Sequence, residues 1–287
     1  MPQFKLRNKK VNRSLAGDIA LFVFLGLVAA YMALPLIYTI NNAFKPLDEI
    51  WEFPPRFFVR NPTSDNFTDL FSLLSTSWVP FTRYIFNTFF ITIAGTAGHV
   101  LLASAAAYPL AKHKFPGSKL IFTVIVLSLM FSANVTAIPN YLIMSWLGWI
   151  NSYAAIIIPA LSAPLGLFLM KQFMESIPNS LLEAAKIDGA SEFSILWRIV
   201  MPTVKPAWLT LILFSFQGLW GNGGGNFIYS EELKPLPYAL GQILAGGVAR
   251  TGAAFAASLI MLVVPITIFI ITQSNVIETM TSSGIKE

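Results

Sequence analysis

Few side chains in this sequence have the type and spacing that catalysis requires. The chain contains two histidines, His99 and His113, and no cysteine, so disulfides and thiolate metal sites are excluded. It also lacks the G-x-S-x-G and H-E-x-x-H spacings, which place a nucleophilic serine on a sharp turn or two zinc-binding histidines on one helix face. We therefore expect no catalytic residue and no metal ligand in this chain.

A glycine-rich run, Gly221 to Gly225, is the segment that comes nearest to a nucleotide-binding loop. A phosphate loop needs a Lys followed by a Ser or Thr after its last glycine, to hold the phosphates and magnesium. Asn226 and Phe227 stand there instead. We interpret the run as a flexible turn and expect this chain to bind no nucleotide itself.

The stretch from Lys171 to Pro206 has the pattern of two short helices joined by a turn. Pro178 is expected to end the preceding helix, and Ser180 with Glu183 three residues later fits a capping box that opens a new one. Asp188-Gly189 would end that helix, because glycine accepts a left-handed conformation at little cost.

The second helix of this stretch is marked by apolar residues on one face, namely Phe193, Leu196, Trp197 and Val200. We expect it to end before Pro202 and Pro206. The first helix presents Ala184 and Ala185, whose small side chains allow close contact with a partner. Such an element could transmit force, although an ordinary helical hairpin at a membrane surface fits the same pattern.

The elements that must position these residues are long and apolar. The chain has 287 residues, of which 55% are hydrophobic and 11% charged, and five uncharged runs of 25 to 51 residues exceed the roughly 20 that one spanning helix needs. The longest run, of 51 residues, is too long for one span and predicts two helices. The sequence therefore predicts an all-α integral membrane protein with six spans, at about 19–40, 84–110, 120–139, 153–173, 206–228 and 252–275.

The distribution of Lys and Arg predicts the orientation. Thirteen lie in the segments on the side of the amino terminus, and six lie on the opposite side. By the positive-inside rule, both termini (1–18 and 276–287) and the loop 175–205 are cytoplasmic. This bias accounts for the net charge of +5, so no nucleic-acid partner is expected.

Polar residues inside the predicted spans are the candidates for substrate contacts, because each must find a partner in the bundle or a wet cavity. An interhelical hydrogen bond is an equally good explanation for each. His99 would serve a proton relay only with a charged partner at the same depth, and no span supplies one. The remaining candidates are Asn87, Thr92, Asn134, Thr136, Asn140 and Gln217.

The cytoplasmic stretch resembles a known motif. Glu183-Ala184-Ala185, Gly189, Ile199 and Pro202 fit the EAA motif of the membrane subunits of binding-protein-dependent ABC importers, with Met201 in place of the usual Leu. The resemblance covers about residues 35 to 215 and is nearest to the carbohydrate-uptake branch, similar to the second maltose-type permease. Its further stretches include Asn42 to Pro46, Phe115 to Gly117, Phe168 to Phe173 and Ile187 to Ser191.

This resemblance implies a half-transporter in a bacterial cytoplasmic membrane. The expected partners are a second homologous permease chain, two ATPase subunits that bind ATP and magnesium, an extracytoplasmic solute-binding protein, the sugar and membrane lipid. It implies that the short helix contacts the ATPase through Glu183, Ala184, Ala185, Asp188, Gly189 and Ala190. An importer for another solute, such as an amino acid or peptide, remains open, as does a secondary transporter. The family often has a Trp-Asn-acidic-aromatic sequence after the fifth span, where this chain has Trp220-Gly221-Asn222-Gly223.

Overall fold

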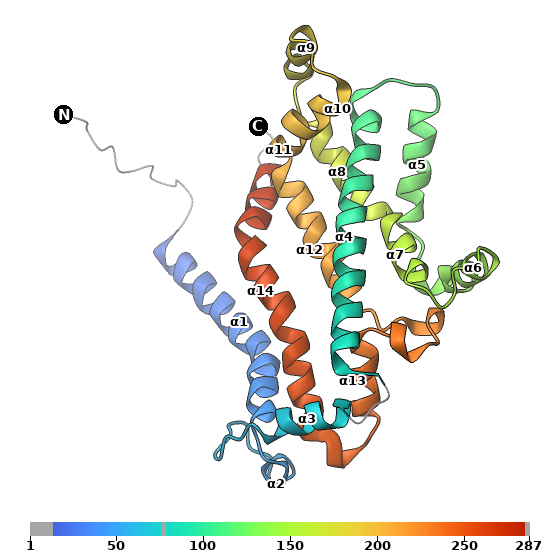
Figure 1. Cartoon of the computed structure of the whole chain (residues 1–287). Coiled ribbons are helices and arrows are strands. Elements are labelled where there is room, and N and C mark those ends of the chain that lie inside the picture. Colours follow the sequence, from blue (N-terminus) through green and yellow to red (C-terminus); the bar gives the residue numbers. More distant parts are fainter. Residues whose placement is uncertain (1–13, 76–78, 285–287) are drawn as a thin grey trace.

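The part of the chain that can be described is helical throughout. The computed structural model describes residues 14–75 and 79–284, and the side chains of these except 74, 133 and 274–284. Within these ranges it contains helices and no strand (Figure 1). The predicted amino-terminal segment lies outside the described residues up to position 13, and the predicted tail does so from position 285.

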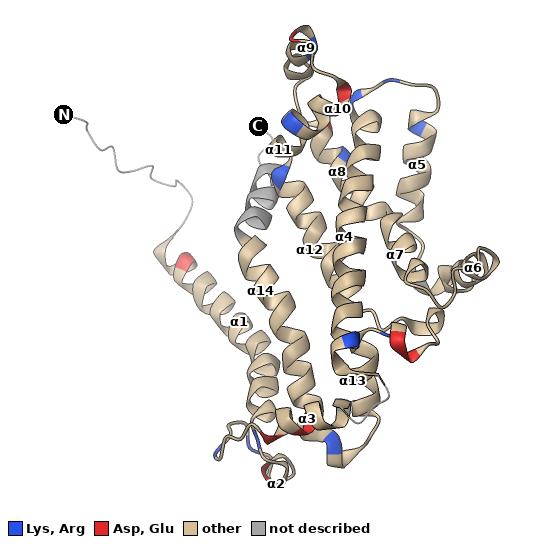
Figure 2. Cartoon of the chain, in the orientation of Figure 1, with Lys and Arg blue, Asp and Glu red and all other residues tan. Residues whose placement is uncertain are grey.

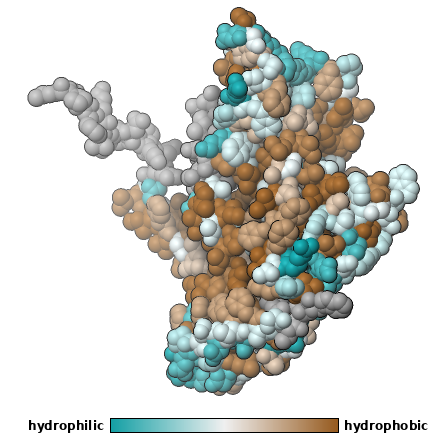
Figure 3. Space-filling model, viewed as in Figure 1, coloured by the Kyte–Doolittle hydropathy of each residue, from teal (hydrophilic) through white to brown (hydrophobic). Residues whose placement is uncertain are grey.

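Four helices in the described ranges are long and apolar enough to cross a membrane, or five if one bent pair is counted as a span. Three of them lie in the long helices α1 (Leu15–Ala43), α4 (Phe81–Lys112) and α14 (Thr251–Gly284). The fourth is the helix pair over Ala154–Glu175. On the face shown in Figure 3, most of the apolar surface lies in the middle and hydrophilic residues gather towards the two ends. This banding is the surface that a bilayer requires, and it agrees with an all-helical membrane protein.

Helix α4 lies at the centre of the bundle and packs against α7 (Ala154–Leu161), α8 (Pro164–Glu175) and α12 (Lys205–Trp220). Glycines on α4 make the close approach possible. A side chain at Gly95 would lie 2.5 Å from Leu219, and one at Gly98 would lie 2.5 Å from Leu161. Small residues at helix contacts are the usual means of packing within a membrane.

Helix α1 stands at the edge of the bundle and packs mainly on α14 (Figure 1). Its first side-chain contact is a cap, in which the hydroxyl of Ser14 accepts from the backbone N–H of Gly17 at 3.1 Å. Most of its apolar side chains are exposed, including Phe22 and Leu27. Such a surface is stable against lipid or another apolar chain, not against water.

The predicted third span is not one continuous helix. The structure has α5 (Ser118–Ser128) followed by α6 (Ala133–Trp146), which turns away from the bundle (Figure 1). The N–H groups of Leu129, Met130 and Phe131 each bond a carbonyl three residues back, which tightens and ends α5. Ser132 is then extended, with φ −73° and ψ 152°. Helix α5 alone is about 17 Å long against a hydrocarbon layer of about 30 Å.

The predicted fourth and fifth spans also differ in detail. The fourth is divided between α7 and α8 at Ser162–Ala163, where Pro164 opens α8 because its missing N–H is not needed in a first helical turn. The fifth ends eight residues early, at Trp220. The following glycines turn the chain, with φ of +81° at Gly224 and +48° at Gly225, into the short 3-10 helix Gly225–Phe227.

Short helices close the end of the bundle opposite the predicted cytoplasmic side. They are α2 (Leu47–Ile50), α3 (Asp65–Ser75), the 3-10 helices Glu231–Leu233 and Val248–Arg250, and α13 (Leu236–Leu244). Asn66 ties this layer to the end of α1 by donating to the carbonyls of Ala43 and Lys45 at 2.9 and 2.7 Å. The loop between α1 and α3 is therefore a folded part of the structure.

Candidate coupling loop and transport pathway

The EAA residues form a separate short helix, α9 (Asn179–Ile187), at the extreme end of the molecule (Figure 1). The helix begins directly after Pro178, whose side chain supplies no cap. The capping box predicted from Ser180 and Glu183 is therefore wrong, because the helix starts one residue before Ser180. The carbonyl of Pro178 instead accepts from the N–H of Leu181.

The end of α9 is formed by the predicted Asp188-Gly189 turn. The N–H groups of Asp188, Gly189 and Ala190 bond the carbonyls of Ala184, Lys186 and Ala185, each at 3.0 Å. Gly189 has φ +79°, the left-handed conformation that glycine adopts readily. Since this geometry satisfies the last carbonyls of the helix, the turn holds α9 in one orientation relative to the next helix.

Helix α9 has one buried and one exposed face. Leu182 and Ala185 are buried in the core beneath it, whereas Glu183 and Ala184 are exposed. Of the two alanines predicted to allow close contact with a partner, Ala185 packs on the core of this chain and Ala184 is exposed. The exposed face also carries Ile187, which is 86% exposed and lies among polar residues at this end of the molecule. A large apolar side chain in that position is available for an interaction with another protein.

Glu192, in the helix that follows α9, connects that helix to α9 and to the end of α4. Its carboxylate accepts from the hydroxyl of Tyr108 on α4 at 2.7 Å, pairs with Lys186 of α9 at 2.6 Å and lies 3.5 Å from His113. The hydrogen bonds from Lys186 and Tyr108 hold the pKa of the Glu192 carboxyl below its usual value. The group therefore stays ionised at neutral pH and links α9 to the end of α4.

The second helix of the stretch continues past Pro202, contrary to the prediction. It comprises α10 (Glu192–Ile195), the π-helical turn Leu196–Val200 and α11 (Met201–Thr203). In the wide turn the N–H of Met201 bonds the carbonyl of Leu196, five residues back. This wider hydrogen-bonding pattern admits Pro202, which has no N–H to place. The chain then bends by 83° into α12.

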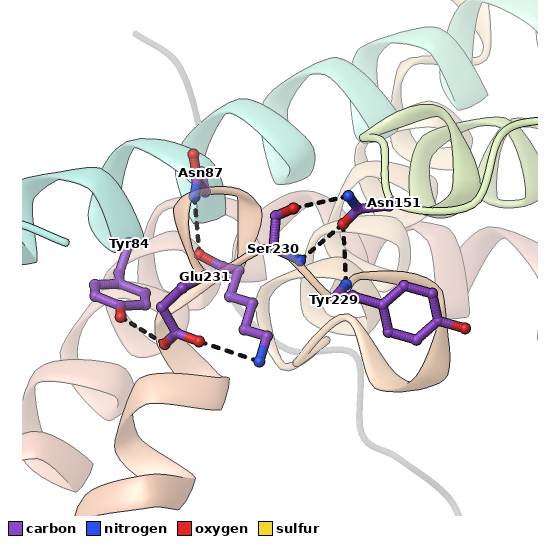
Figure 4. A network of polar contacts seen from close by, with 7 residues as sticks. Tyr84, Asn87, Asn151, Tyr229, Ser230 and Glu231 are labelled. Atoms are coloured by element: carbon purple, nitrogen blue, oxygen red, sulfur yellow. Dashed lines mark hydrogen bonds and ion pairs between the residues drawn. The ribbon is translucent and has the colours of Figure 1, made fainter. Parts of the chain in front are cut away.

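Asn87, a predicted substrate contact, ties the outer loop to the bundle. Its amide nitrogen donates to the carbonyls of Glu232 and Lys234, both at 2.8 Å, and its oxygen accepts from the hydroxyl of Tyr153 at 2.6 Å. Nearby, Tyr84 donates to Glu231 at 2.7 Å (Figure 4). Asn87 is fully buried and has used its hydrogen-bonding capacity within the fold.

Asn151 fixes the other side of the same loop (Figure 4). Its oxygen accepts from the N–H groups of Tyr229 and Ser230 at 3.0 and 2.8 Å, and its nitrogen donates to the Ser230 hydroxyl at 2.7 Å. Asn151 has φ +62°, a conformation that asparagine tolerates better than most residues. The two asparagines thus hold the segment 227–234 in a defined position.

Exchange of Asn87 for leucine is expected to release this loop, since two backbone carbonyls and one hydroxyl would lose their partner in a buried place. Backbone amides over 229–236 should exchange with deuterium at least about tenfold faster, which corresponds to roughly 1.4 kcal/mol. The control is Asn134→Leu, an exposed amide on α6. Equal exchange in the two variants would show that Asn87 does not hold the loop.

The other predicted pathway residues are dispersed. Thr92 is fully buried and its hydroxyl has no partner among the described residues. Asn134 and Gln217 are exposed and Thr136 is half-buried, and none of the three lines the cavity that includes Asn140. Asn140 lines a cavity together with Ser215 and Asn222, neither of which is among the residues predicted from the sequence. Ser215 and Asn222 are seven positions apart, a spacing that places two residues on the same face of a helix, and this spacing could have indicated them from the sequence.

His99 reaches two helices through uncharged partners. Its Nδ1 lies 2.7 Å from the Ser215 hydroxyl and its Nε2 lies 3.0 Å from the carbonyl of Ala163. These contacts join α4 to α12 and to the break between α7 and α8. The interhelical hydrogen bond is thus the explanation that fits His99. No group of three His, Asp or Glu residues close enough to hold a metal occurs within 14–75 and 79–284.

Comparison with known proteins places the chain in a family. A family model described as the binding-protein-dependent transport system inner membrane component matches residues 99–281. The chain belongs to this family. The matched region of the permease contains α9 and the helices that pack around α4, which confirms the family indicated by the EAA motif.

Relatives of the permease extend over most of its length. It is 33% identical to Protein LplC of Bacillus subtilis over 83% of this chain and 78% of the relative. It is 29% identical to the arabinooligosaccharides transport system permease protein AraQ of Halalkalibacterium halodurans, over 92% and 94%. A crystal structure of a bacterial ABC transporter that imports the acidic polysaccharide alginate contains a chain of the same fold, with a TM-score of 0.77, 23% identity and coverage of 92% and 98%.

Proposed function

We propose that this permease forms half of the translocation pathway of an ATP-driven importer, for a sugar or oligosaccharide that an extracytoplasmic binding protein delivers. The observation that carries the proposal is α9, a short helix that projects from the bundle, exposes Glu183, Ala184 and Ile187, and is joined to α4 through Glu192. The sugar class is supported by relatives such as the arabinooligosaccharide permease.

The remaining parts of the complex follow from this role. A second permease chain completes the pathway, and two ATPase subunits bind ATP and magnesium and receive α9. Closure of the ATPase dimer would push on α9, and the ties through Glu192 and the turn at Gly189 would pass that motion to the spanning helices. Hydrolysis then takes place outside this chain.

The proposed orientation places α9 in the cytoplasm, together with both termini. Lys and Arg are frequent around the end of the bundle that carries α9 (Figure 2), as the positive-inside rule requires of the cytoplasmic side. We propose six crossings, with α5 and α6 together as the third and α12 as the fifth. The layer containing α2, α3 and α13 then faces the binding protein.

The complex purified with its partners should hydrolyse ATP faster when sugar-loaded binding protein is added, and it should accumulate the sugar in proteoliposomes only with ATP. Exchange of Glu183 for glutamine is expected to lower ATP-driven uptake several-fold, because the exposed carboxylate meets a basic group of the ATPase. Asp18→Asn, a carboxylate in the first turn of α1 and outside the layer that faces the binding protein, is the control. A chain that moves solute without ATP would overturn the proposed function. Unchanged uptake in Glu183→Gln would show that the Glu183 carboxylate makes no essential contact with the ATPase.

A further inference from the structure

A cleft opens between the outer halves of the central helices. Its deeper part has a volume of about 350 Å³ and includes His99 of α4, Asn140 of α6, Phe214 of α12 and Asn222. A second cavity of about 660 Å³ is lined by Tyr141, Asn226 and Tyr229. Both are lined by Phe227, so we treat them as one outer cleft. Volumes of roughly 300 to 1,000 Å³ are usual for small-molecule sites.

Amide side chains in the outer cleft have unused hydrogen-bonding capacity. Those of Asn140 and Asn226 form no hydrogen bond with the described residues. Asn222 uses only its oxygen, which accepts from the N–H of Gly224 at 2.8 Å. Asn140 is half-buried and Asn226 is exposed, so the amides of both are open to water or to a polar ligand in the cleft. Each amide offers both donors and an acceptor, which is what hydroxyl groups require.

Aromatic rings stand beside these amides. Phe214 of α12 lines the deeper part of the cleft and is 47% exposed, and Tyr229 lines the outer part and is 57% exposed. The rings of Tyr141 and Phe227 have centroids 6.1 Å apart, and the hydroxyls of Tyr141 and Tyr229 lie 2.7 Å apart. A pyranose or furanose ring has C–H faces and hydroxyl edges. Aromatic faces alternating with amides therefore match its chemistry.

The glycine-rich run has a definite place in this cleft. The positive φ angles of Gly224 and Gly225 turn the chain sharply after α12. Asn226 and Phe227 follow at once and line the cleft beside Tyr141 of α6. Asn151 also binds this loop, because its N–H bonds the carbonyl of Phe227 at 2.7 Å. The run therefore builds one wall of the cleft.

Charge is absent from the lining of the outer cleft. None of the residues around either cavity is Asp, Glu, Lys or Arg. A carboxylate or phosphate entering there would lose water without gaining a counter-charge, which is strongly unfavourable. We propose that the outer cleft is a binding site for an uncharged sugar on its way through the permease. This inference rests on the proposed function and narrows its substrate class.

The absence of cysteine from the natural chain allows a direct test. Single cysteines are introduced at Ala160 and Ala137, which line the deeper and outer parts of the cleft, and at Ala249 as a control. Ala249 is exposed and lines a separate cavity beside Arg250. The full complex with its binding protein is labelled with a small neutral methanethiosulfonate, with and without arabinotriose, galactotriose or the acidic trigalacturonate.

We expect a neutral trisaccharide to slow labelling at positions 160 and 137 at least about threefold, trigalacturonate to have no effect, and position 249 to be indifferent to all three sugars. Protection by trigalacturonate alone would overturn the inference. The inference would also be overturned if no sugar changed the labelling rate while ATP-driven uptake of a neutral trisaccharide proceeded. It would likewise be overturned if the thiols at positions 160 and 137 did not react even without sugar, because another subunit covers them. ATP-driven uptake of none of the sugars would instead count against the proposed function.

Discussion

Replacement of Glu192 by leucine is expected to lower ATP-driven uptake about tenfold while the permease still folds and assembles with its ATPase. The carboxylate is the common acceptor of Tyr108 on α4 and Lys186 on α9. A hydrogen bond to a charged group contributes about 1.5–3 kcal/mol. Because Glu192 is half exposed, we take the lower end of that range, which corresponds to a factor of about ten.

In the Glu192→Leu variant, uptake should fall more than ATP hydrolysis because Glu192 links α9 to α4. Helix α9 contacts the core through Leu182 and Ala185, and these contacts remain in the variant. The link from α9 to the end of α4 is lost, so ATPase motion would move α9 without moving α4. The ratio of sugar transported to ATP hydrolysed should therefore fall.

The measurement is this ratio in proteoliposomes that contain the complete transporter. Glu192→Gln keeps an acceptor for Tyr108 but loses the charge that pairs with Lys186, so an intermediate ratio is expected. Glu52→Gln is the control, because Glu52 forms a similar exposed ion pair with Arg56 in the opposite layer. A wild-type ratio in Glu192→Leu would show that α9 acts on the bundle by another route.

Features set by local sequence were predicted well. The end of α9 could be predicted from Gly189, because a glycine in the left-handed conformation ends a helix through local hydrogen bonds that need no distant contact. The helices α1, α4 and α14 also follow directly from long uncharged runs. Both signals act within a few turns of the chain, so no knowledge of tertiary contacts is needed to read them.

Features that depend on distant contacts could not be predicted. The break before Ser132 interrupts a run of apolar residues that carries no proline or glycine at that point. The sequence predicts Asn87 as a pathway residue because a polar group in a span needs a partner. Its partners, the carbonyls of Glu232 and Lys234, lie 145 and 147 positions away. The type of residue indicated that a hydrogen bond was required, but only the fold determines with which group it forms.

Exchange of Gly166 for alanine is expected to destabilise the permease by about 1–3 kcal/mol net. A Cβ at this position of α8 would overlap Nε2 of His99 and lie 2.8 Å from its Cε1. The imidazole would have to move and would lose its contact with the carbonyl of Ala163, 3.0 Å away. Overpacking of this kind costs about 1–3 kcal/mol, and a partly buried carbonyl deprived of its partner adds about 1 kcal/mol. The gain of about 1 kcal/mol by which alanine favours a helix offsets part of this cost.

Thermal unfolding in mild detergent, followed by tryptophan fluorescence, measures this effect as a fall in Tm of several degrees. Gly26→Ala is the matched control, because a Cβ there meets nothing within 4 Å and alanine favours the helix by about 1 kcal/mol. Its Tm should be unchanged or higher. If Gly166→Ala unfolds at the wild-type temperature, α8 can move away from α4 at that point. The His99 contacts to Ser215 and Ala163 would then not be what fixes the centre of the bundle.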